Sequence, residues 1–146
     1  MNIYLKLLLG ILVCVIAYLA LRKPQKPNRR PRVYIAGPYS TGSPQENTDR
    51  AIDVADQIVD LGADPFIPHL FHYRHARRER PYQFWIDEDL RWLEVCDALF
   101  RFPGKSSGAE NEITVMRDTH HRPVFYDLES LEAWIDEWNG ENTHEH

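Results

Sequence analysis

The sequence predicts a small α/β domain, built on a doubly wound parallel sheet and preceded by one transmembrane helix. Two observations predict the sheet: short apolar runs alternate with helix-period patterns from residue 32 onward, and four of these runs have the length of strands. A third predicts the membrane segment, because residues 3–21 are almost wholly apolar and carry only one charge, Lys6. With 146 residues the chain has room for one such domain and not for two.

The apolar run at the N-terminus has the length of a membrane-spanning helix. About 20 apolar residues cross a hydrocarbon core of roughly 30 Å, and residues 1–22 just meet this need. A cleaved signal peptide is the alternative, but no small-x-small cleavage site follows the run. Basic residues come directly after it at Arg22, Lys23 and Lys26, and such flanks stay in the cytoplasm. We therefore expect a single-pass membrane protein whose α/β domain lies in the cytoplasm.

Charge and composition divide the chain into regions. Six of the 17 Lys and Arg residues lie within residues 1–31, which hold no acid, and the other 11 share the rest of the chain with all 22 acids. An acidic domain repels phosphates, so no nucleic-acid partner is expected. We expect the basic residues that follow the apolar run to fix the orientation of the chain in the membrane. Contact of these residues with anionic lipid headgroups is the alternative. The composition predicts a basic, proline-rich linker over residues 23–31, the α/β domain over residues 32–138 and a disordered tail over residues 139–146.

The two cysteines indicate a reducing compartment. Cys14 lies in the apolar run and Cys96 in the domain, so the two thiols are not expected to pair.

Each expected element has a local reason. The run 32–36 is a strand because it is short and apolar, and Gly37-Pro38 ends it. A helix follows because Ser43, with proline after it, fits the capping position, apolar residues recur at helical spacing, and Gly62 fits the end. The later elements are assigned on the same patterns. In chain order we expect strand 32–36, helix 44–61, strand 64–67, a polar basic loop 69–80, helix 82–95, strand 98–102, a loop 104–108, helix 109–119, strand 123–126 and helix 128–138.

Three of the predicted loops meet at one edge of this sheet. In open parallel sheets of the flavodoxin or Rossmann-like kind, ligands bind beyond the carboxyl ends of the strands. Residues 37–42, 69–80 and 104–108 all follow strand ends, so we expect the functional site among them.

Two carboxylates point toward the interior side of predicted helices. On the helical wheel of residues 85–97, Asp89 falls near the middle of the apolar arc, so it must be paired or face a cavity. Glu112 lies on the inward side of the helix 109–119, in the first turn, where the helix dipole favours its ionised form. Taken singly, each acid also fits a satisfied structural carboxylate. Asp97 lies at a helix end and is expected to be a turn or capping acid.

The loops beside these acids allow several interpretations. Residues 104–108 (GKSSG) enter a helix and can present N–H groups to anions, but Leu99 stands where a Walker A motif needs glycine. His69, His72 and His75 recur at three-residue spacing, yet no acid or cysteine completes a ligand set, so no metal site is expected. The histidine segment is either a solvated loop or a flap over the substrate. On the second interpretation His69 binds the substrate.

Four segments in a fixed order carry a family resemblance. They are residues 33–39 (VYIAGPY), the helix Asp89-Leu90-x-x-Leu93-x-x-x-Asp97, the run Ser106-x-Gly108-Ala109-x-x-Glu112, and Arg122-Pro123-Val124. Together they resemble the nucleoside 2-deoxyribosyltransferase-like family, which includes deoxynucleoside-monophosphate N-glycosidases. The resemblance covers about residues 32–126 and would make the chain a membrane-anchored branch of that family.

The resemblance implies a site and a chemistry. Glu112 would be the nucleophile or the oxocarbenium stabiliser at C1′ of the sugar, and Asp89 would hold the sugar or help to protonate the departing base. It implies no metal or organic cofactor, and a homodimer in which neighbouring subunits complete the pocket. The substrate-binding positions that it implies are Gly37, Tyr39, Ser106 and Gly108.

We therefore expect an enzyme that cleaves or transfers the N-glycosidic bond of a (deoxy)nucleoside or nucleotide, with hydrolysis ahead of transfer. Glu110 could repel a substrate phosphate, which leaves open whether a 5′-phosphate is required. One alternative is a membrane-held sensor that binds a nucleotide without turnover. The other is an interaction protein that acts through Trp134 and Trp138, which share a face of the last helix.

Overall fold

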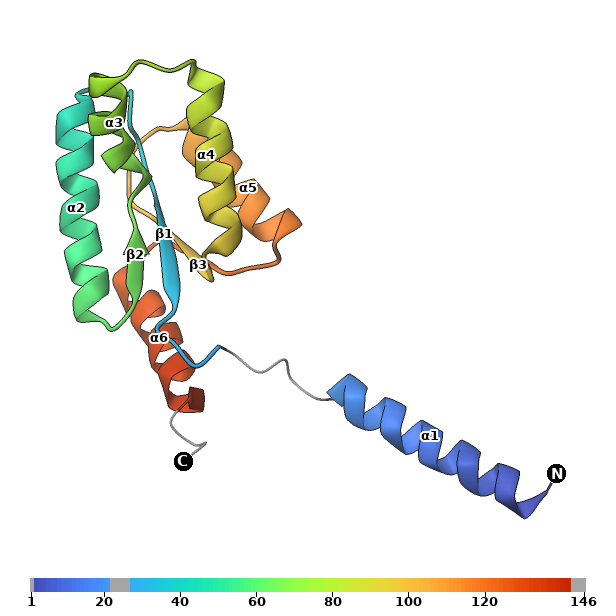
Figure 1. Cartoon of the computed structure of the whole chain (residues 1–146). Coiled ribbons are helices and arrows are strands. Elements are labelled where there is room, and N and C mark those ends of the chain that lie inside the picture. The colour runs from blue at the N-terminus through green and yellow to red at the C-terminus, as the bar shows by residue number, and fades with distance from the viewer. Residues whose placement is uncertain (1, 22–26, 143–146) are drawn as a thin grey trace.

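A four-stranded parallel sheet forms the centre of the computed structural model, which describes residues 2–21 and 27–142 (Figure 1). Its strands are β1 (Arg32–Ala36), β2 (Asp64–Phe66), β3 (Ala98–Arg101) and β4 (Val124–Phe125), in the spatial order β2-β1-β3-β4. All three pairings are parallel. The chain therefore winds from β1 to one side and then crosses to the other, and the predicted parallel α/β sheet is confirmed.

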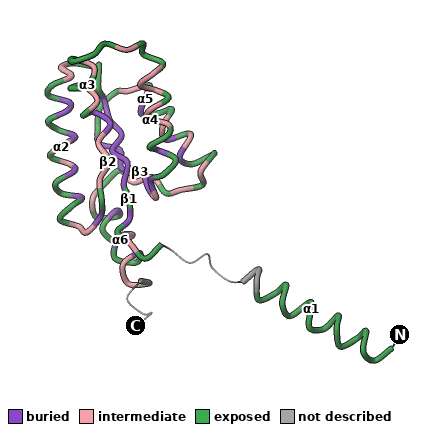
Figure 2. The backbone as a smooth tube through the Cα atoms, in the orientation of Figure 1, coloured by how far each residue is buried: buried purple, intermediate pink, exposed green. Residues whose placement is uncertain are grey.

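Helices cover both faces of this sheet. The helices α2 (Pro44–Asp60) and α6 (Leu128–Asn142) pack on one face, while α4 (Tyr82–Val95) and α5 (Ser107–Thr114) pack on the other. A π-helical turn, η2 (Val115–Thr119), continues α5. Val33 and Ile35 belong to the first core and Tyr34 and Ala36 to the second, because neighbouring strand residues point to opposite faces. Figure 2 shows the resulting burial along β1, in which Val33 to Ala36 are buried and Arg32 is exposed.

The segment predicted as a polar loop is mostly helical, so that prediction was wrong. Residues 68–77 form a short 3₁₀ turn, η1 (Pro68–Leu70), and the helix α3 (Phe71–Arg77). The Phe71 ring lies 6.0 Å from that of Phe66 and 5.5 Å from that of Trp85, and the Arg74 guanidinium lies over it at 4.9 Å. These aromatic contacts come from distant segments, so the polar composition of the segment gave no sign of them.

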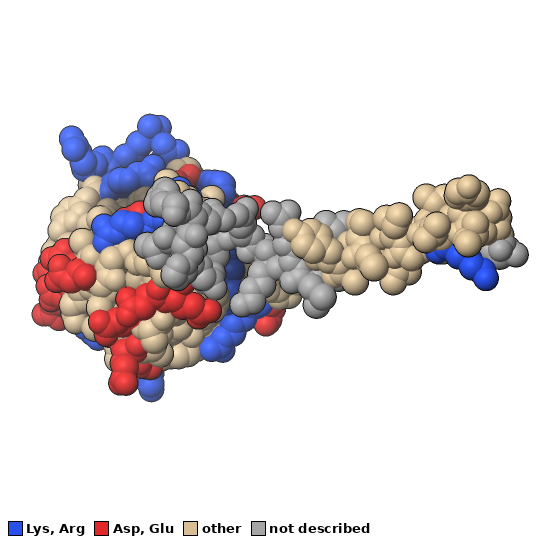
Figure 3. Space-filling model, turned by 90° about the horizontal axis from the view of Figure 1, so that it is seen from below, with Lys and Arg blue, Asp and Glu red and all other residues tan. Residues whose placement is uncertain are grey.

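The N-terminal helix α1 (Ile3–Leu21) lies apart from the domain (Figure 1). Figure 3 shows it projecting from the domain, and Lys6 is the only Lys or Arg residue within it. Among the described residues, no helix combines the length and the apolar character needed to cross a membrane, so the transmembrane helix predicted over residues 1–22 is not supported. Residues 1 and 22–26, which belong to the predicted anchor and linker, lie outside the described residues.

Residues 27–31 are fastened to the amino-terminal edge of the sheet. Asp97 accepts two hydrogen bonds from the Arg29 guanidinium, at 2.6 and 2.9 Å, and a third from the backbone N–H of Arg32 at 2.8 Å. The indole N–H of Trp138 donates to the carbonyl oxygen of Arg29 at 2.8 Å. We call this set of contacts the Arg29–Asp97 clasp. It holds the C-terminal part of the predicted linker against the domain.

The last helix runs further than the sequence suggested. α6 continues to Asn142, so residues 139–142 of the predicted disordered tail are helical, and residues 143–146 lie outside the described residues. Trp138 is 6% exposed, and the Trp134 ring packs 5.5 Å from that of Phe125. Both tryptophans are therefore packing residues of the domain.

Candidate functional site

A cavity of about 550 Å³ opens at the carboxyl ends of β1 and β3. These are the neighbouring strands from which the chain departs in opposite directions, the position where open parallel sheets bind ligands. Its walls come from the loop after β1, from η1 and α3, from α4, and from the first turn of α5. The volume falls in the range of small-molecule sites. All seven residues predicted for the site line this cavity: Glu112, Asp89, Gly37, Tyr39, Ser106, Gly108 and His69.

Glu112 reaches the cavity from α5 and is held by a residue of β1. The hydroxyl group of Tyr34, a side chain with no exposed surface, donates a hydrogen bond to Oε1 of Glu112 at 2.8 Å. Burial raises the pKa of Glu112 to about 8, and the Asp89 charge acts in the same direction. The Tyr34 hydrogen bond and the Arg101 charge oppose this rise because they stabilise the ionised carboxylate.

Asp89 enters the same cavity from the middle of α4. Its Oδ1 atom is buried and has no hydrogen-bond partner in the described part of the chain. Burial raises the pKa of Asp89 to about 7, with a smaller contribution in the same direction from Glu88. Asp89 and Glu112 thus both bind a proton near neutral pH, which is the property required of a general acid–base pair.

The first turn of α5 forms the third wall. The Oγ atom of Ser106 accepts a hydrogen bond from the backbone N–H of Ala109 at 3.2 Å and caps the helix. Glu110 follows in that turn and forms an ion pair with Nη2 of Arg101 at 3.3 Å. Arg101 is 7% exposed and also donates to the carbonyl oxygen of Gly104. The charge of Glu110, expected to repel a phosphate, is therefore partly neutralised.

The three histidines of η1 and α3 have different partners. Nε2 of His69 lies 3.0 Å from the carbonyl oxygen of Pro38. Nδ1 of His72 lies 2.9 Å from the Tyr39 hydroxyl, and Nδ1 of His75 accepts from the Trp85 indole N–H at 2.9 Å. Within residues 2–21 and 27–142, no three His, Cys, Asp or Glu side chains are grouped as a metal site. These contacts instead build an aromatic, hydrogen-bonded wall.

Two residues that support the site were not singled out from the sequence. Tyr34 was assigned to a buried strand, although a hydroxyl group in such a strand needs a partner and so carried a signal. Arg101 is a charge inside the apolar run of β3, which also predicts a buried partner.

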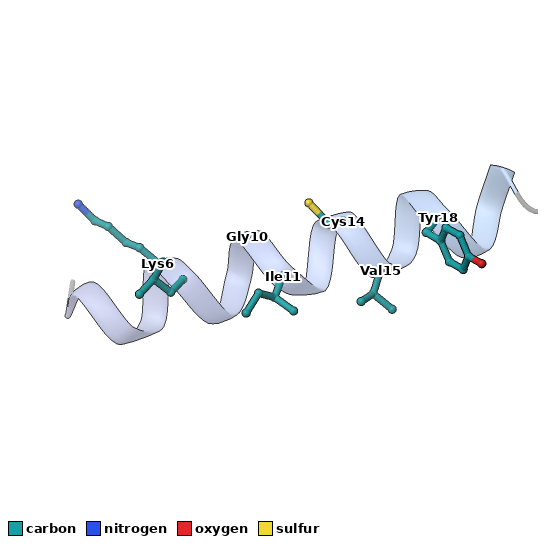
Figure 4. Close-up of a pocket in the computed structure, with 7 residues that line it drawn as sticks. Lys6, Gly10, Ile11, Cys14, Val15 and Tyr18 are labelled. Carbon is teal, nitrogen blue, oxygen red and sulfur yellow. The ribbon is translucent and has the colours of Figure 1, made fainter.

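A second concavity, of about 480 Å³, lies along α1 and does not belong to this site. Figure 4 shows that its lining comes from successive turns of this one helix. The lining contains no Asp, Glu or His, and its titratable side chains are those of Lys6, Cys14 and Tyr18. The labelled residues are Lys6, Gly10, Ile11, Cys14, Val15 and Tyr18.

The comparisons with known proteins bear on the family and on the fold. The model of a family described as "Domain of unknown function (DUF7768)" matches residues 31–126. No curated protein matches the chain in sequence. A solved 2-deoxyribosyltransferase from the psychrotolerant bacterium Bacillus psychrosaccharolyticus is similar in structure, with a TM-score of 0.50, 16% identity, and coverage of 69% of this chain and 90% of that chain. At this identity the similarity shows a distantly related fold. Since the family model spans most of the domain, the chain belongs to the DUF7768 family.

Proposed function

We propose that this protein cleaves or transfers the N-glycosidic bond of a (deoxy)nucleoside or nucleotide, with hydrolysis ahead of transfer. The observation that carries the proposal is the presence of two half-buried acidic residues, Glu112 and Asp89, whose pKa values are both raised, in one small-molecule cavity. Glycosidic bonds are broken by such pairs, in which one group meets positive charge at the anomeric carbon and the other assists the leaving group. The fold similarity to a 2-deoxyribosyltransferase supports the same chemistry.

The two carboxyl groups have different roles in this reaction. The Glu112 carboxylate, positioned by the Tyr34 hydroxyl, attacks C1′ of the sugar. The electron pair of the C1′–N bond leaves with the base, and protonated Asp89 supplies the proton that the departing nitrogen needs. The glycosyl ester on Glu112 is then hydrolysed by water, which passes a proton to the Asp89 carboxylate. If a second base replaces water in this step, the product is a new nucleoside.

The other walls of the cavity fit the rest of a nucleoside. Phe71 of α3, Trp85 of α4 and Tyr39 of the loop after β1 give the cavity an aromatic lining, and aromatic side chains stack on bases of any type. Ser106 and Gly108 lie at the start of α5, where a hydroxyl or phosphate group of the sugar can meet backbone N–H groups.

The test is base release by the full chain. The protein is incubated with a panel of nucleosides and 5′-nucleotides, and free base is measured by chromatography. Glu112→Gln should abolish release, whereas Glu132→Gln, the same change at an exposed position of α6, should leave it unchanged. Absence of release by the wild-type protein, or equal release by Glu112→Gln, would exclude the enzymatic proposal.

A binding protein without turnover is the second candidate. A pKa of about 8 keeps most Glu112 side chains protonated at pH 7, and a protonated carboxyl is a poor nucleophile. The cavity would then serve as a nucleotide sensor. Calorimetry that shows nucleotide binding, together with no product over hours, would favour this candidate over the enzyme.

Location and assembly form a separate part of the proposal. We propose that α1 attaches the domain to the cytoplasmic face of a membrane, and that a second copy of the chain completes the pocket. Deletion of residues 1–26 keeps Arg29 and its clasp, so it should remove membrane fractionation without unfolding the domain. Sedimentation of the truncated protein then tests the homodimer.

A further inference from the structure

The connection between α3 and α4 brings positive charge to the cavity. Four of the seven residues from 74 to 80 are arginines and one, Glu79, is an acid, although the chain from residue 32 onward holds twice as many acids as Lys and Arg residues. Figure 1 shows the connection passing from α3 to α4 at the end of the sheet to which β1 leads. Residues 79–82 line the cavity. A cluster of one sign beside a cavity attracts ligand charge of the opposite sign.

Arg80 is the arginine of this connection that lines the cavity. Of all the Lys and Arg residues that the structure describes, it alone belongs to the lining. The residue is half-buried, and its guanidinium carbon lies 4.8 Å from the centre of the Phe84 ring. Contact with a ring face holds a guanidinium in place and leaves its N–H groups free to bind an anion.

No carboxylate of the described chain neutralises Arg80. Arg74 pairs with Glu88 at 3.7 Å, but no acid within residues 2–21 and 27–142 forms an ion pair with Arg80. Its neighbour Glu79 is exposed and also lines the cavity, yet residues 77–80 keep a net charge of +2. A guanidinium presents N–H donors in a fork that matches the two oxygens of a carboxylate. The charge of Arg80 is therefore available to a ligand.

The order of residues along α4 indicates which end of the ligand meets Arg80. Tyr82 begins α4 and Asp89 lies seven residues later, so the start of the helix is about 10 Å from Asp89 along its axis, at 1.5 Å per residue. Arg80 precedes this start by two residues, and Trp85 lies between Tyr82 and Asp89. In the proposed reaction Asp89 protonates the base, and the aromatic lining stacks on it. Arg80 then lies beyond the base, away from the scissile bond.

We infer that Arg80 is the anion-binding residue of the cavity, and that the ligand is a nucleoside whose base carries a carboxylate. The inference rests on the proposed function, because that function places the base beside Asp89, and it goes further by naming the class of base. A phosphate on the sugar is the other source of an anion, and it would require the opposite orientation of the ligand.

Matched nucleosides test this selection. Nicotinic acid riboside and nicotinamide riboside have the same shape and differ by a carboxylate against a carboxamide. 5-Carboxy-2′-deoxycytidine and 2′-deoxycytidine differ by the carboxylate alone. Adenosine 5′-monophosphate and adenosine form the pair that tests the sugar side. Affinities are measured by calorimetry with the full chain.

We expect the wild-type protein to prefer the carboxylate in at least one of the first two pairs by about tenfold, the effect of a hydrogen bond between charged groups. The preference should shrink at about 1 M salt, because a half-buried charge is still screened in part.

Three variants separate direct contact from the general field of the arginines. Arg80→Gln removes the charge in the cavity and should reduce the preference to about onefold to twofold. Arg80→Lys keeps the charge without the fork and should retain part of the preference. Arg78→Gln removes the same charge from an exposed residue outside the lining, and the preference should remain. Thermal melting checks that all three variants are folded.

The variants decide whether Arg80 acts as inferred. A carboxylate preference that Arg80→Gln loses and Arg78→Gln retains supports the inference. Equal affinity for both members of the first two pairs overturns it, as does a preference that Arg80→Gln retains or that both variants lose equally. Loss in Arg80→Gln of a preference for the 5′-monophosphate alone also overturns it, because the sugar then faces Arg80. Should Arg80→Gln not fold, the comparison of Arg80→Lys with Arg78→Gln decides in the same way.

The same measurements distinguish the inference from the proposed function. If base is released from uncharged nucleosides and no carboxylate is preferred, the proposed function stands and the inference fails. If carboxylated nucleosides bind through Arg80 but no base is released, the inference stands and the enzymatic proposal fails. If no nucleoside binds, both fail.

Discussion

Removal of the Tyr34 hydroxyl should shift the pH dependence of the reaction to higher pH. Tyr34→Phe keeps the buried ring of β1 and removes only the hydrogen bond to Glu112. That bond stabilises the ionised carboxylate and lowers the pKa of Glu112 against the effect of burial. Since the proposed nucleophile must be ionised, the variant needs a higher pH to reach the same reactive fraction.

The size of this shift follows from the strength of the lost bond. A hydrogen bond to a charged group contributes about 1.5–3 kcal/mol, which corresponds to a pKa change of about one to two units. With a pKa of about 8, roughly one tenth of Glu112 is ionised at pH 7. In Tyr34→Phe the ionised fraction falls to ~1% or ~0.1%, so kcat/KM at pH 7 should fall about tenfold to a hundredfold.

The assay is kcat/KM for base release between pH 5 and pH 10, which reports the ionisations of the free enzyme. The acidic limb of the profile should move to higher pH in Tyr34→Phe and should not move in Tyr126→Phe, which removes a hydroxyl at an exposed position outside the cavity. An unmoved acidic limb, or a rate that falls equally at every pH, would refute the role assigned to Tyr34.

Three further predictions concern stability. Because the folded-state pKa of Glu112 is raised, protonated Glu112 stabilises the fold fully below about pH 4.5, and this stabilisation is lost as the pH rises toward about 8. The uncharged side chain of Glu112→Gln avoids that loss. The variant should therefore raise Tm by about 5 °C at pH 8 and hardly at pH 5, as measured by calorimetry. Asp97→Ala removes the Arg29–Asp97 clasp at the opposite edge of the sheet, so urea denaturation should show a loss of ~2 kcal/mol with unchanged kcat per folded molecule. A Cβ atom at Gly37 would lie 2.0 Å from the Phe102 ring, so Gly37→Ala should lower stability by about 1–3 kcal/mol and weaken nucleoside binding in calorimetry.

The sequence predicted the sheet and the two carboxylates for the same reason, namely periodicity. Strand-length runs between helical patterns are typical of parallel sheets, and a carboxylate in the apolar arc of a helix stands out against its neighbours. The role of Tyr34 could not be predicted in this way. In a strand that is buried on both faces, the hydrophobic pattern is the same whether a tyrosine hydroxyl bonds within the core or to a residue of the site. The helix α3 was missed because it depends on contacts of Phe71 with distant rings.

The two edges of the sheet differ in how well their polar groups are satisfied, and this difference can decide the role of Glu112. At the amino edge, Asp97 accepts three hydrogen bonds and belongs to a structural clasp. At the carboxyl edge, Glu112 accepts a hydrogen bond from Tyr34, while Asp89 has a buried oxygen without a partner in the described part of the chain. Neutralising a structural carboxylate such as Asp97 should lower stability, because its partners lose a charge. Neutralising a catalytic carboxylate such as the one proposed at Glu112 should raise stability near pH 8, because burial disfavours its ionised form. Opposite signs for Asp97→Asn and Glu112→Gln in the same melting experiment would therefore separate the functional acid from the structural one, before any substrate is known.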